Sequence, residues 1–407
     1  MAAAPNNARR HVIFLNRRDS SHPERGGSEV FLERVAEHLL ELDWRVTVMC
    51  AQHPGAAPDI ELRGVRYIRS GGDLGLYFHA ARAVLGQRRG FGPLGPADVI
   101  VDVQNGMPFC SPLLTRTPVV NLVHHVHREQ WQVVLPGIKG RVGWLLESRL
   151  APRVYRRSVY VAVSPATRDE LARLGVTPSQ VRVVYNGTDV RPVPDQLRAA
   201  RPTVLAVSRL VPHKRLDLAV SAAAQLRGRV PDLRLVIAGM GYWENELRVQ
   251  IRQLGLTDCV ELVGWVDEEQ KHRLMAEAWV MAAPSLKEGW GLSVIEAAAH
   301  GTPSVAFHGA GGLSDSIVNG KTGLLVHGGV DEFSAGLERV LTDRDLREQL
   351  QAAARAHATA FTWAGTAASM ARVIDEAAQN ATDSARKASS IRRRSPGAAR
   401  SAAPENA

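Results

Sequence analysis

The feature that most constrains this chain is an alternation of short apolar segments with helix-like segments, almost from end to end. Each apolar segment has the length and aliphatic content of a buried strand. These segments are His11–Leu15, Arg45–Cys50, Val65–Arg69, Asp98–Val103, Pro118–His124, Val159–Val163, Val181–Tyr185, Thr203–Ser208, Leu233–Ala238, Val260–Val263, Trp279–Ala283, Pro303–Phe307 and Gly323–Val326. Because two parallel strands can be joined only by a crossover, the alternation predicts an α/β fold with two doubly wound parallel sheets.

The boundary between two domains is predicted near residue 190. Asn186 and Gly187 end the first set of strands, and a polar stretch with several prolines precedes the strand that begins at Thr203. A polar stretch with glycine and several prolines is typical of a turn or a linker. We therefore expect an N-terminal domain over residues 10–190 and a C-terminal domain over residues 200–361.

The composition changes after the second domain. A helix is predicted over residues 362–378. Residues 380–407 are rich in Ala, Ser and Arg and have no apolar period, which predicts a basic disordered tail. The run Arg392-Arg393-Arg394 could touch anionic lipid or nucleic acid, although a solvated tail is the simpler interpretation.

Length and cysteine content limit the class of protein and its compartment. The 407 residues suffice for two domains. No apolar run approaches the ~20 residues that a membrane-spanning helix needs, and the stretch Val12–Leu15 is too short for a signal peptide. Three widely spaced cysteines argue against a disulfide framework and for a reducing compartment. We therefore expect a cytoplasmic protein.

Positive charge gathers in the first half of the chain. The formal net charge is +9, and residues 1–199 carry 26 lysines and arginines against 18 acidic residues. This excess predicts an anionic partner for the first domain. The sequence has no helix-turn-helix pattern, zinc-finger spacing or RNA-binding aromatic motif, so we do not expect nucleic acid as a partner.

A glycine turn between two glutamates marks a candidate site in the second half. Glu288 lies in the turn Glu-Gly-Trp-Gly, and Glu296 lies eight positions later in the helix that this turn opens. Gly289 and Gly291 allow a ligand to approach the backbone, and the amides of a helix start favour anions. The second carboxylate, two turns along, can reach another part of the same ligand. A nucleotide sugar, with phosphates between two hydroxylated rings, fits this arrangement.

This stretch resembles the donor-site motif of the retaining glycosyltransferases of family 4, which have the GT-B fold of two Rossmann-like domains facing across a cleft. The matching positions are Pro284, Ser285, Glu288, Gly289, Trp290, Gly291, Leu292 and Glu296. Trp290 stands where Phe is commoner and would keep an aromatic wall. The resemblance covers residues 10–378 and implies that Glu288 contacts hydroxyls of the donor sugar and Glu296 those of the ribose. It also implies that the helix over residues 362–378 crosses back to the N-terminal domain.

Two basic residues, Arg209 and Lys214, follow the first strand of the second domain. Ligands of open parallel sheets bind outside the carboxyl ends of the strands. A departing nucleoside diphosphate needs fixed cations or N–H dipoles near it. Both residues match the diphosphate-binding arginine and lysine of the family, which implies that they stabilise the leaving group.

Two glycine-bearing turns match further donor contacts of the family. Gly26 and Gly27 open a helix after the first strand and resemble the family's Gly-Gly loop, which faces the donor diphosphate across the cleft. The lack of a G-x-G-x-x-G pattern there argues against a nicotinamide dehydrogenase. Gly264, Trp265 and Val266 end another strand, at the place where family members hold the nucleotide base against the backbone.

Three histidines, His124, His125 and His127, lie at the carboxyl end of one strand. Successive residues of a strand point to opposite faces, and no carboxylate cluster completes a metal site. The resemblance implies that His124 faces the reacting sugar. His125 and His127 stay open as acceptor contacts.

Two acidic motifs are interpreted as structural. Asp343 and Asp345 match the metal-binding Asp-x-Asp of other glycosyltransferases, but they lie in a polar turn where Asp343 is a good N-cap. Asp315 stands where the family usually has Glu and is carried over only as a helix-start residue. We expect no metal and no cofactor, because Arg209 and Lys214 can supply the positive charge.

The predicted function is that of a retaining glycosyltransferase. It would move a sugar from a UDP- or GDP-sugar to a glycan, glycolipid or small-molecule acceptor, with Glu288, His124, Arg209 and Lys214 as the catalytic set. Two alternatives stay open, a nucleotide-sugar epimerase or phosphorylase-like GT-B enzyme and a non-catalytic sugar-binding scaffold.

A basic amphipathic segment spans Gly137–Arg157, with six lysines and arginines and one acid. Its apolar stripe consists of Trp144, Leu145, Leu146, Leu150 and Val154. A helix of this kind can lie on an anionic lipid surface, and the stripe can equally pack into the first domain. We therefore expect either inward packing or peripheral contact with the inner face of the membrane.

Overall fold

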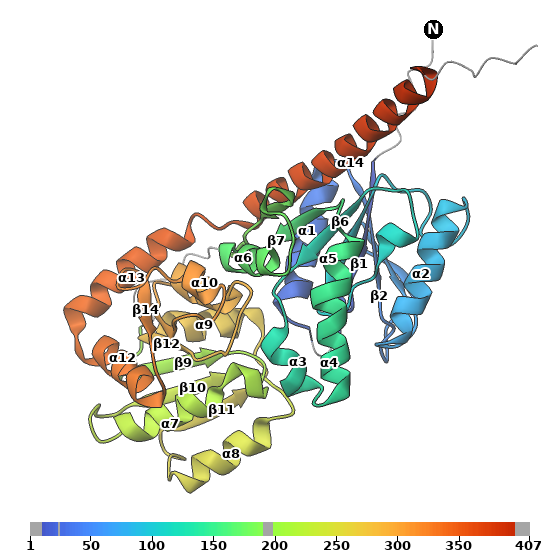
Figure 1. Ribbon diagram of the computed structural model, residues 1–407. Helices are drawn as coiled ribbons and strands as arrows, with labels where there is room; N and C mark the ends of the chain where they lie inside the picture. The colour runs from blue at the N-terminus through green and yellow to red at the C-terminus, as the bar shows by residue number, and fades with distance from the viewer. Residues whose placement is uncertain (1–9, 23–24, 190–197, 395–407) are drawn as a thin grey trace, which may run out of the picture.

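The computed structural model describes residues 10–22, 25–189 and 198–394. It consists of two α/β lobes side by side, one built on an eight-stranded sheet and the other on a six-stranded sheet (Figure 1). Among the described residues, no helix is both long and apolar enough to cross a membrane. Two parallel-sheet domains are the fold class that the sequence predicts.

The sheet of the N-terminal lobe is parallel except at one edge. Its strands are β1 (His11–Leu15), β2 (Arg45–Cys50), β3 (Asp59–Leu62), β4 (Val65–Arg69), β5 (Val99–Gln104), β6 (Val119–Val123), β7 (Val159–Ala162) and β8 (Val181–Val183). They lie in the order β3-β4-β2-β1-β5-β6-β7-β8, and β3 runs antiparallel to β4. The chain order reverses between β1 and β5, which makes this the switch point where open parallel sheets bind ligands.

The sheet of the C-terminal lobe is parallel throughout its described strands. They are β9 (Thr203–Val207), β10 (Arg234–Ala238), β11 (Val260–Gly264), β12 (Val280–Ala283), β13 (Ser304–Phe307) and β14 (Gly323–Val326). Their order is β11-β10-β9-β12-β13-β14, so the switch point of this sheet lies between β9 and β12.

Helices cover both faces of each sheet. They are α1 (Gly27–Glu41), α2 (Gly75–Arg88), α3 (Arg128–Val134), α4 (Ile138–Leu145), α5 (Ala151–Val154), α6 (Pro165–Arg173), α7 (Leu216–Leu226), α8 (Glu244–Gln253), α9 (Glu268–Glu277), α10 (Leu292–Ala299), α11 (Leu313–Ser316), α12 (Val330–Thr342), α13 (Arg344–Ala358) and α14 (Trp363–Arg394). In β1, Val12 and Phe14 share a core with α1 and α14, whereas Ile13 and Leu15 share one with α2. Burial on both faces explains why the strands are continuous apolar runs.

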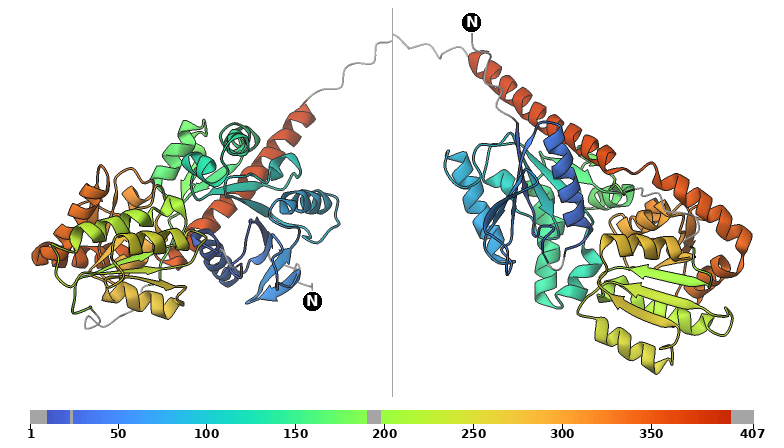
Figure 2. Two further views of the ribbon diagram at one scale, coloured as in Figure 1. Left: turned by 90° about the horizontal axis from the view of Figure 1, so that it is seen from below. Right: turned by 180° about the vertical axis from the view of Figure 1, so that it is seen from behind.

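The two lobes are connected twice. The chain passes from β8 into the second lobe, and α14 returns from that lobe to pack along α1 (Figure 2). Where the connections meet, Thr188 N donates a hydrogen bond to Phe361 O at 3.0 Å. Gly187 lies so close to the backbone of Trp363 that a Cβ there would overlap it. The Asn-Gly segment is therefore the point of contact between both connections.

Helix α14 extends further than the sequence indicates. Its first part belongs to the core of the N-terminal lobe through Met370 and Ile374. It then continues as helix to Arg394. The predicted disordered tail over residues 380–407 thus begins as helix, because alanine, which recurs there, has the highest helix propensity. Residues 395–407 lie outside the described residues.

Candidate active site

A pocket lies at the switch point of the C-terminal sheet, where β9 and β12 end side by side. The polar residues that line it are Ser208, Lys214, Ser285, Glu288 and Ser293. The glycine turn with the first glutamate and the basic segment after β9 are far apart in the sequence. The sheet topology brings them to one edge.

Glu288 and Lys214 form an ion pair in this pocket. Lys214 Nζ lies 2.5 Å from Glu288 Oε1, and Ser285 Oγ donates a hydrogen bond to the same oxygen at 2.7 Å. Burial alone would raise the pKa of Glu288, but the Lys214 ammonium and the Ser285 hydroxyl outweigh burial and hold this pKa below its usual value. Glu288 is therefore ionised near pH 7 and can accept hydrogen bonds from sugar hydroxyls.

The turn that carries Glu288 is fixed by its backbone. Glu288 N donates to Ala310 O at 3.1 Å, and Gly312 N donates to Glu288 O at 2.8 Å. Gly291 has a φ of +88° and directly precedes α10. A Cβ at Gly291 would also overlap the side chain of Leu313. Both the backbone conformation and the close packing therefore require glycine at this position.

Arg209 faces the glycine pair of the other lobe. Its side chain is exposed. A Cβ built on Gly26 would lie 3.9 Å from Arg209 Nε, and one on Gly27 would lie 3.7 Å from Leu292 Cδ2. Gly26 N donates to Glu29 Oε2 at 2.7 Å, which closes the first turn of α1. The glycine pair, Arg209 and Leu292, all predicted in the donor site, thus meet at the boundary between the lobes.

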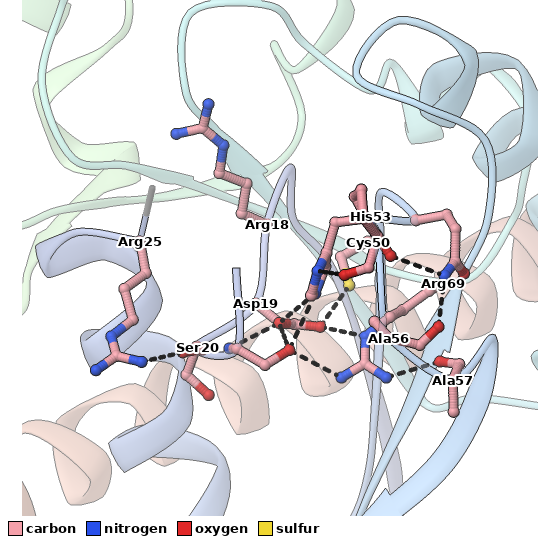
Figure 3. Close-up of polar contacts among 12 residues, drawn as sticks. Arg18, Asp19, Ser20, Arg25, Cys50, His53, Ala56, Ala57 and Arg69 are labelled. Atoms are coloured by element: carbon pink, nitrogen blue, oxygen red, sulfur yellow. Dashed lines mark hydrogen bonds and ion pairs between the residues drawn. The ribbon is translucent and has the colours of Figure 1, made fainter. Parts of the chain in front are cut away.

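A buried network holds the loop that leads to the glycine pair (Figure 3). Asp19, which is 2% exposed, accepts from Arg69 Nε at 2.5 Å and from Cys50 Sγ at 3.3 Å. Ser21 Oγ donates to Asp19 at 2.6 Å and lies 3.0 Å from His53 Nε2. Burial alone would raise the pKa of Asp19, but the hydrogen bonds from Ser21 and Arg69 lower it. The network ties the loop to β2 and β4, and its scattered members gave no sequence signal.

His124 and Gly289 bring the two lobes together beside the turn that carries Glu288. A Cβ on Gly289 would overlap the carbonyl oxygen of His124. The His124 ring packs edge-on against Phe31, and its Nε2 has no hydrogen-bond partner among the described residues. Burial, with a smaller contribution from His127, lowers the pKa of His124 to about 4. His124 is therefore a neutral imidazole near pH 7 with one unused ring nitrogen.

The other two histidines have partners within the N-terminal lobe. His125 Nε2 lies 2.9 Å from Gln130 Oε1, and His127 Nδ1 lies 3.0 Å from Glu147 Oε1. Burial, with the nearby His127, lowers the pKa of His125 well below its usual value. Within the described part of the chain, no three His, Cys, Asp or Glu side chains are grouped so that they could hold a metal ion.

Glu296 is paired inside its own lobe. Lys271 of α9 donates to Glu296 Oε1 at 2.9 Å and also pairs with Glu268 at 2.9 Å. Burial raises the pKa of Glu296, and Lys271 opposes this rise. Lys271 had no sequence signal, because the packing of α9 against α10 brings it to the glutamate. A ribose bound at this position would contact a carboxylate that is already ion-paired with Lys271.

The side chain of Trp290 does not line the pocket as the sequence predicts. It is 2% exposed, and its ring centroid lies 4.8 Å from that of Tyr185 and 4.9 Å from that of Phe361. These three rings fill the junction where both connections between the lobes meet. Trp290 therefore packs in this junction, and its backbone alone belongs to the glycine turn.

The candidate base-binding turn follows β11. Gly264 has a φ of +73° and accepts a hydrogen bond from Gly239 N at 2.8 Å. Trp265 is 59% exposed and Val266 is partly exposed. A Cβ at Gly239 would overlap the backbone of Ser208, so the glycine after β10 lets this turn approach the end of β9. The exposed indole is available to stack on a ligand ring.

The acidic residues that the sequence assigns to helix starts both cap helices. Asp343 Oδ1 accepts from Leu346 N at 2.9 Å at the start of α13. Asp315 Oδ2 accepts from Ala166 N at 2.8 Å in the first turn of α6. Because α6 belongs to the N-terminal lobe, the second cap also links the lobes.

Two parallel α/β sheets, with a pocket at the switch point of one and the glycine loop of the other facing it, define the GT-B class of glycosyltransferases. The family described as Glycosyltransferase Family 4 matches residues 25–191, and the one described as Glycosyl transferases group 1 matches residues 193–357. A GDP-mannose-dependent alpha-(1-6)-phosphatidylinositol monomannoside mannosyltransferase of Mycobacterium tuberculosis is 34% identical over 265 residues, which are 58% of this chain and 68% of the relative. The chain belongs to glycosyltransferase family 4.

A second relative agrees with this assignment, and two solved structures share the fold. A D-inositol 3-phosphate glycosyltransferase of Kribbella flavida is 38% identical over 213 residues, 47% of this chain. The matched part spans 50% of that relative's length. The fold is shared with sucrose-phosphate synthase from Thermosynechococcus elongatus (TM-score 0.76, 22% identity, 90% of this chain and 99% of that one). It is also shared with HepE from Anabaena in complex with UDP and glucose (TM-score 0.70, 21% identity, 90% and 100%).

Proposed function

We propose that this protein is a retaining glycosyltransferase that moves a hexose from a nucleoside-diphosphate donor to an acceptor held by the N-terminal lobe. The Lys214–Glu288 pair at the switch point of the C-terminal sheet carries the proposal. A diphosphate there would lie between Lys214 and Arg209 on one side and the amides at the start of α1 on the other. The sugar would then present its hydroxyls to Glu288.

In the proposed mechanism, the positive charges of Lys214 and Arg209 stabilise the leaving group. When the bond between the anomeric carbon and the diphosphate oxygen breaks, the electron pair passes to that oxygen, where Lys214 and Arg209 would stabilise it. The acceptor oxygen would attack the same sugar face and lose its proton to the released diphosphate oxygen, which retains the configuration. His124, whose carbonyl abuts Gly289 next to Glu288, would help to position the sugar. Under this scheme the enzyme needs no covalent nucleophile.

The donor in this proposal is a UDP- or GDP-sugar. Solved structures of HepE contain UDP or UDP-glucose, and the mycobacterial relative is named for GDP-mannose. An exposed Trp265 offers a stacking surface to either base. The relatives named for inositol 3-phosphate and for a phosphatidylinositol mannoside support a small-molecule, glycan or glycolipid acceptor.

Product analysis with and without an acceptor tests the reaction class. A transferase releases the nucleoside diphosphate and forms a glycoside only when an acceptor is present. An epimerase converts the donor without any acceptor, and a phosphorylase-like enzyme consumes inorganic phosphate in the reverse direction. If the protein is a non-catalytic scaffold, the donor is hydrolysed no faster with the protein than in buffer alone.

We also propose that the reaction needs no divalent metal and takes place in the cytoplasm. Lys214 and Arg209 supply the charge that a metal ion provides in other glycosyltransferases. Cys50, Cys110 and Cys259 are all unpaired, which fits a reducing compartment.

An anionic lipid surface is the further partner that we propose. Helix α4 exposes Ile138 by 76%, Val142 by 49% and Leu145 by 56% on one face, while Trp144 and Val154 pack inward. The apolar stripe that the sequence predicts is therefore divided between the core and the surface. Exposed cations lie beside the outer part, at Lys139, Arg141, Arg149 and Arg153. An apolar face flanked by cations is complementary to an anionic membrane.

A further inference from the structure

Lys287, the residue before Glu288, crosses the boundary between the lobes. Its side chain is 6% exposed. The ammonium lies 3.1 Å from Glu129 Oε2 and forms a second ion pair with Glu170. Glu129 lies in α3 and Glu170 in α6, both in the N-terminal lobe. Lys287, which lies in the turn that carries Glu288, is thus ion-paired with carboxylates of the opposite lobe.

Burial makes these ion pairs depend on contact between the lobes. A buried ammonium is strongly disfavoured unless opposite charges face it. Within the described residues, the ion-pair partners of Lys287 are Glu129 and Glu170 alone. Burial raises the pKa of Glu170, and Lys287 opposes this rise. If the lobes separated, Lys287 would therefore lose both partners and would have to be hydrated.

Two further contacts lie along the same boundary. Gly289 abuts the carbonyl oxygen of His124, and Asp315 caps α6. Lys287 and Gly289 flank Glu288 on its two sides, so the residues next to the donor-binding carboxylate make the contact with the other lobe. The place of Glu288 relative to His124 is set by these contacts.

We propose that Lys287 is a positioning residue that couples closure of the two lobes to the placement of Glu288 and His124 on one donor sugar. The catalytic consequence rests on the proposed function, whereas the contact between the lobes does not. When the ion pairs of Lys287 break, the contact between the lobes beside Glu288 loosens, and His124 is no longer held in place next to the sugar. The diphosphate loses the amides at the start of α1 but keeps both cations, because Lys214 and Arg209 belong to the C-terminal lobe.

Kinetics separate this role from a purely structural one. Lys287→Met should lower kcat about tenfold or more, since small displacements of reacting groups are costly. It should raise the Kd of UDP or GDP, whichever binds the wild type, by a smaller factor than it lowers kcat, because Lys214 and Arg209 still hold the diphosphate. A defect in folding of the C-terminal lobe would instead raise the Kd by at least the factor by which kcat falls. Lys287→Arg, which can bridge two carboxylates, should keep most of kcat. Lys321→Met removes an exposed lysine of the same lobe and should change neither quantity.

Hydrogen exchange tests the contact without any turnover. In Lys287→Met, the peptide that covers α6 should exchange faster than in the wild type, and in Lys321→Met it should not. Lys287→Glu should have the same effect as Lys287→Met. The double variant Lys287→Glu/Glu170→Lys restores an ion pair of reversed sign and should recover part of the protection.

The inference is overturned if α6 keeps its wild-type protection in Lys287→Met, or if the charge-swapped pair recovers none of the protection lost in Lys287→Glu. Both results stand whether or not the protein transfers a sugar. If the wild type transfers no sugar while α6 loses protection in Lys287→Met, the proposed function is wrong and the contact between the lobes is upheld. If the wild type transfers sugar and Lys287→Met has unchanged kcat, the coupling to catalysis is wrong.

Discussion

Lys214 Nζ lies 2.5 Å from Glu288 Oε1, although one residue follows β9 and the other follows β12. Each side chain is largely buried and each neutralises the other. A diphosphate that binds Lys214 would also lie beside Glu288. The pair therefore places the diphosphate of a donor next to the carboxylate that we propose binds its sugar. Because both residues sit on turns fixed by the sheet, this relationship is preorganised before a ligand arrives.

Substitution of either member of this pair should strongly reduce the rate of sugar transfer. Lys214→Ala and Glu288→Ala should each reduce kcat/KM at least ~100-fold, as expected for the loss of one preorganised charge. The double variant should lose less than the product of the two single effects, because the residues act as a pair. Steady-state rates of purified, folded variants measure this. Near-normal turnover in either single variant would show that the donor site lies elsewhere.

Transfer should survive removal of divalent metals. The positive charge at the diphosphate is expected from Lys214 and Arg209, and the described side chains offer no grouping that could hold a metal ion. Initial rates in EDTA should therefore match those in untreated buffer. Loss of activity in EDTA and its return with a divalent ion would contradict this and would redirect attention to His124 and His127.

Stability should fall as the pH drops below the ordinary range of histidine. Folding lowers the pKa of His124 from 6.5 to about 4, so between these values the unfolded chain binds a proton that the folded chain excludes. Acid therefore favours unfolding, by up to ~3 kcal/mol for one such group. Burial also lowers the pKa of His213 to about 4, which acts in the same direction. Urea unfolding across this range should show a shallower pH dependence for His124→Gln, and an identical dependence would contradict the assignment.

Binding to lipid should depend on both charge and the exposed stripe of α4. We expect co-sedimentation with anionic vesicles at low salt, since each cation near the surface contributes about 1 kcal/mol. The double variant Ile138→Glu/Val142→Glu should lose most of this binding. Leu74→Glu, which changes an equally exposed leucine of the N-terminal lobe, should retain it. Equal partition onto neutral and anionic vesicles would remove lipid as a partner.

The strands were predictable because burial on both faces makes each one a continuous apolar run. Their observed ends differ from the expected ones by two residues at most. The exception is β3 (Asp59–Leu62), an edge strand that is largely exposed and alternates acidic with aliphatic residues. Nothing in such a segment marks it as a strand until it pairs with β4.

Side-chain partners were harder to predict than motif positions. Residues such as Arg209 and Glu288 follow strand ends, which the sheet order brings together. In contrast, Lys271 and Lys287 have partners on helices that pack from elsewhere in the chain. Trp290 was misplaced for the same reason, because Tyr185 and Phe361 meet it only at the junction of the lobes.

The most direct test of the donor site is the stabilisation of the protein by nucleoside diphosphates. Unfolding of the wild type and of Lys214→Ala should be followed with UDP, GDP and ADP in turn. At 100 times its Kd, the correct nucleotide should stabilise the wild type by ~2.7 kcal/mol, and Lys214→Ala should lose most of this gain at the same concentration. If no nucleoside diphosphate stabilises the wild type, or if Lys214→Ala is stabilised equally, the donor site is not at the Lys214–Glu288 pair.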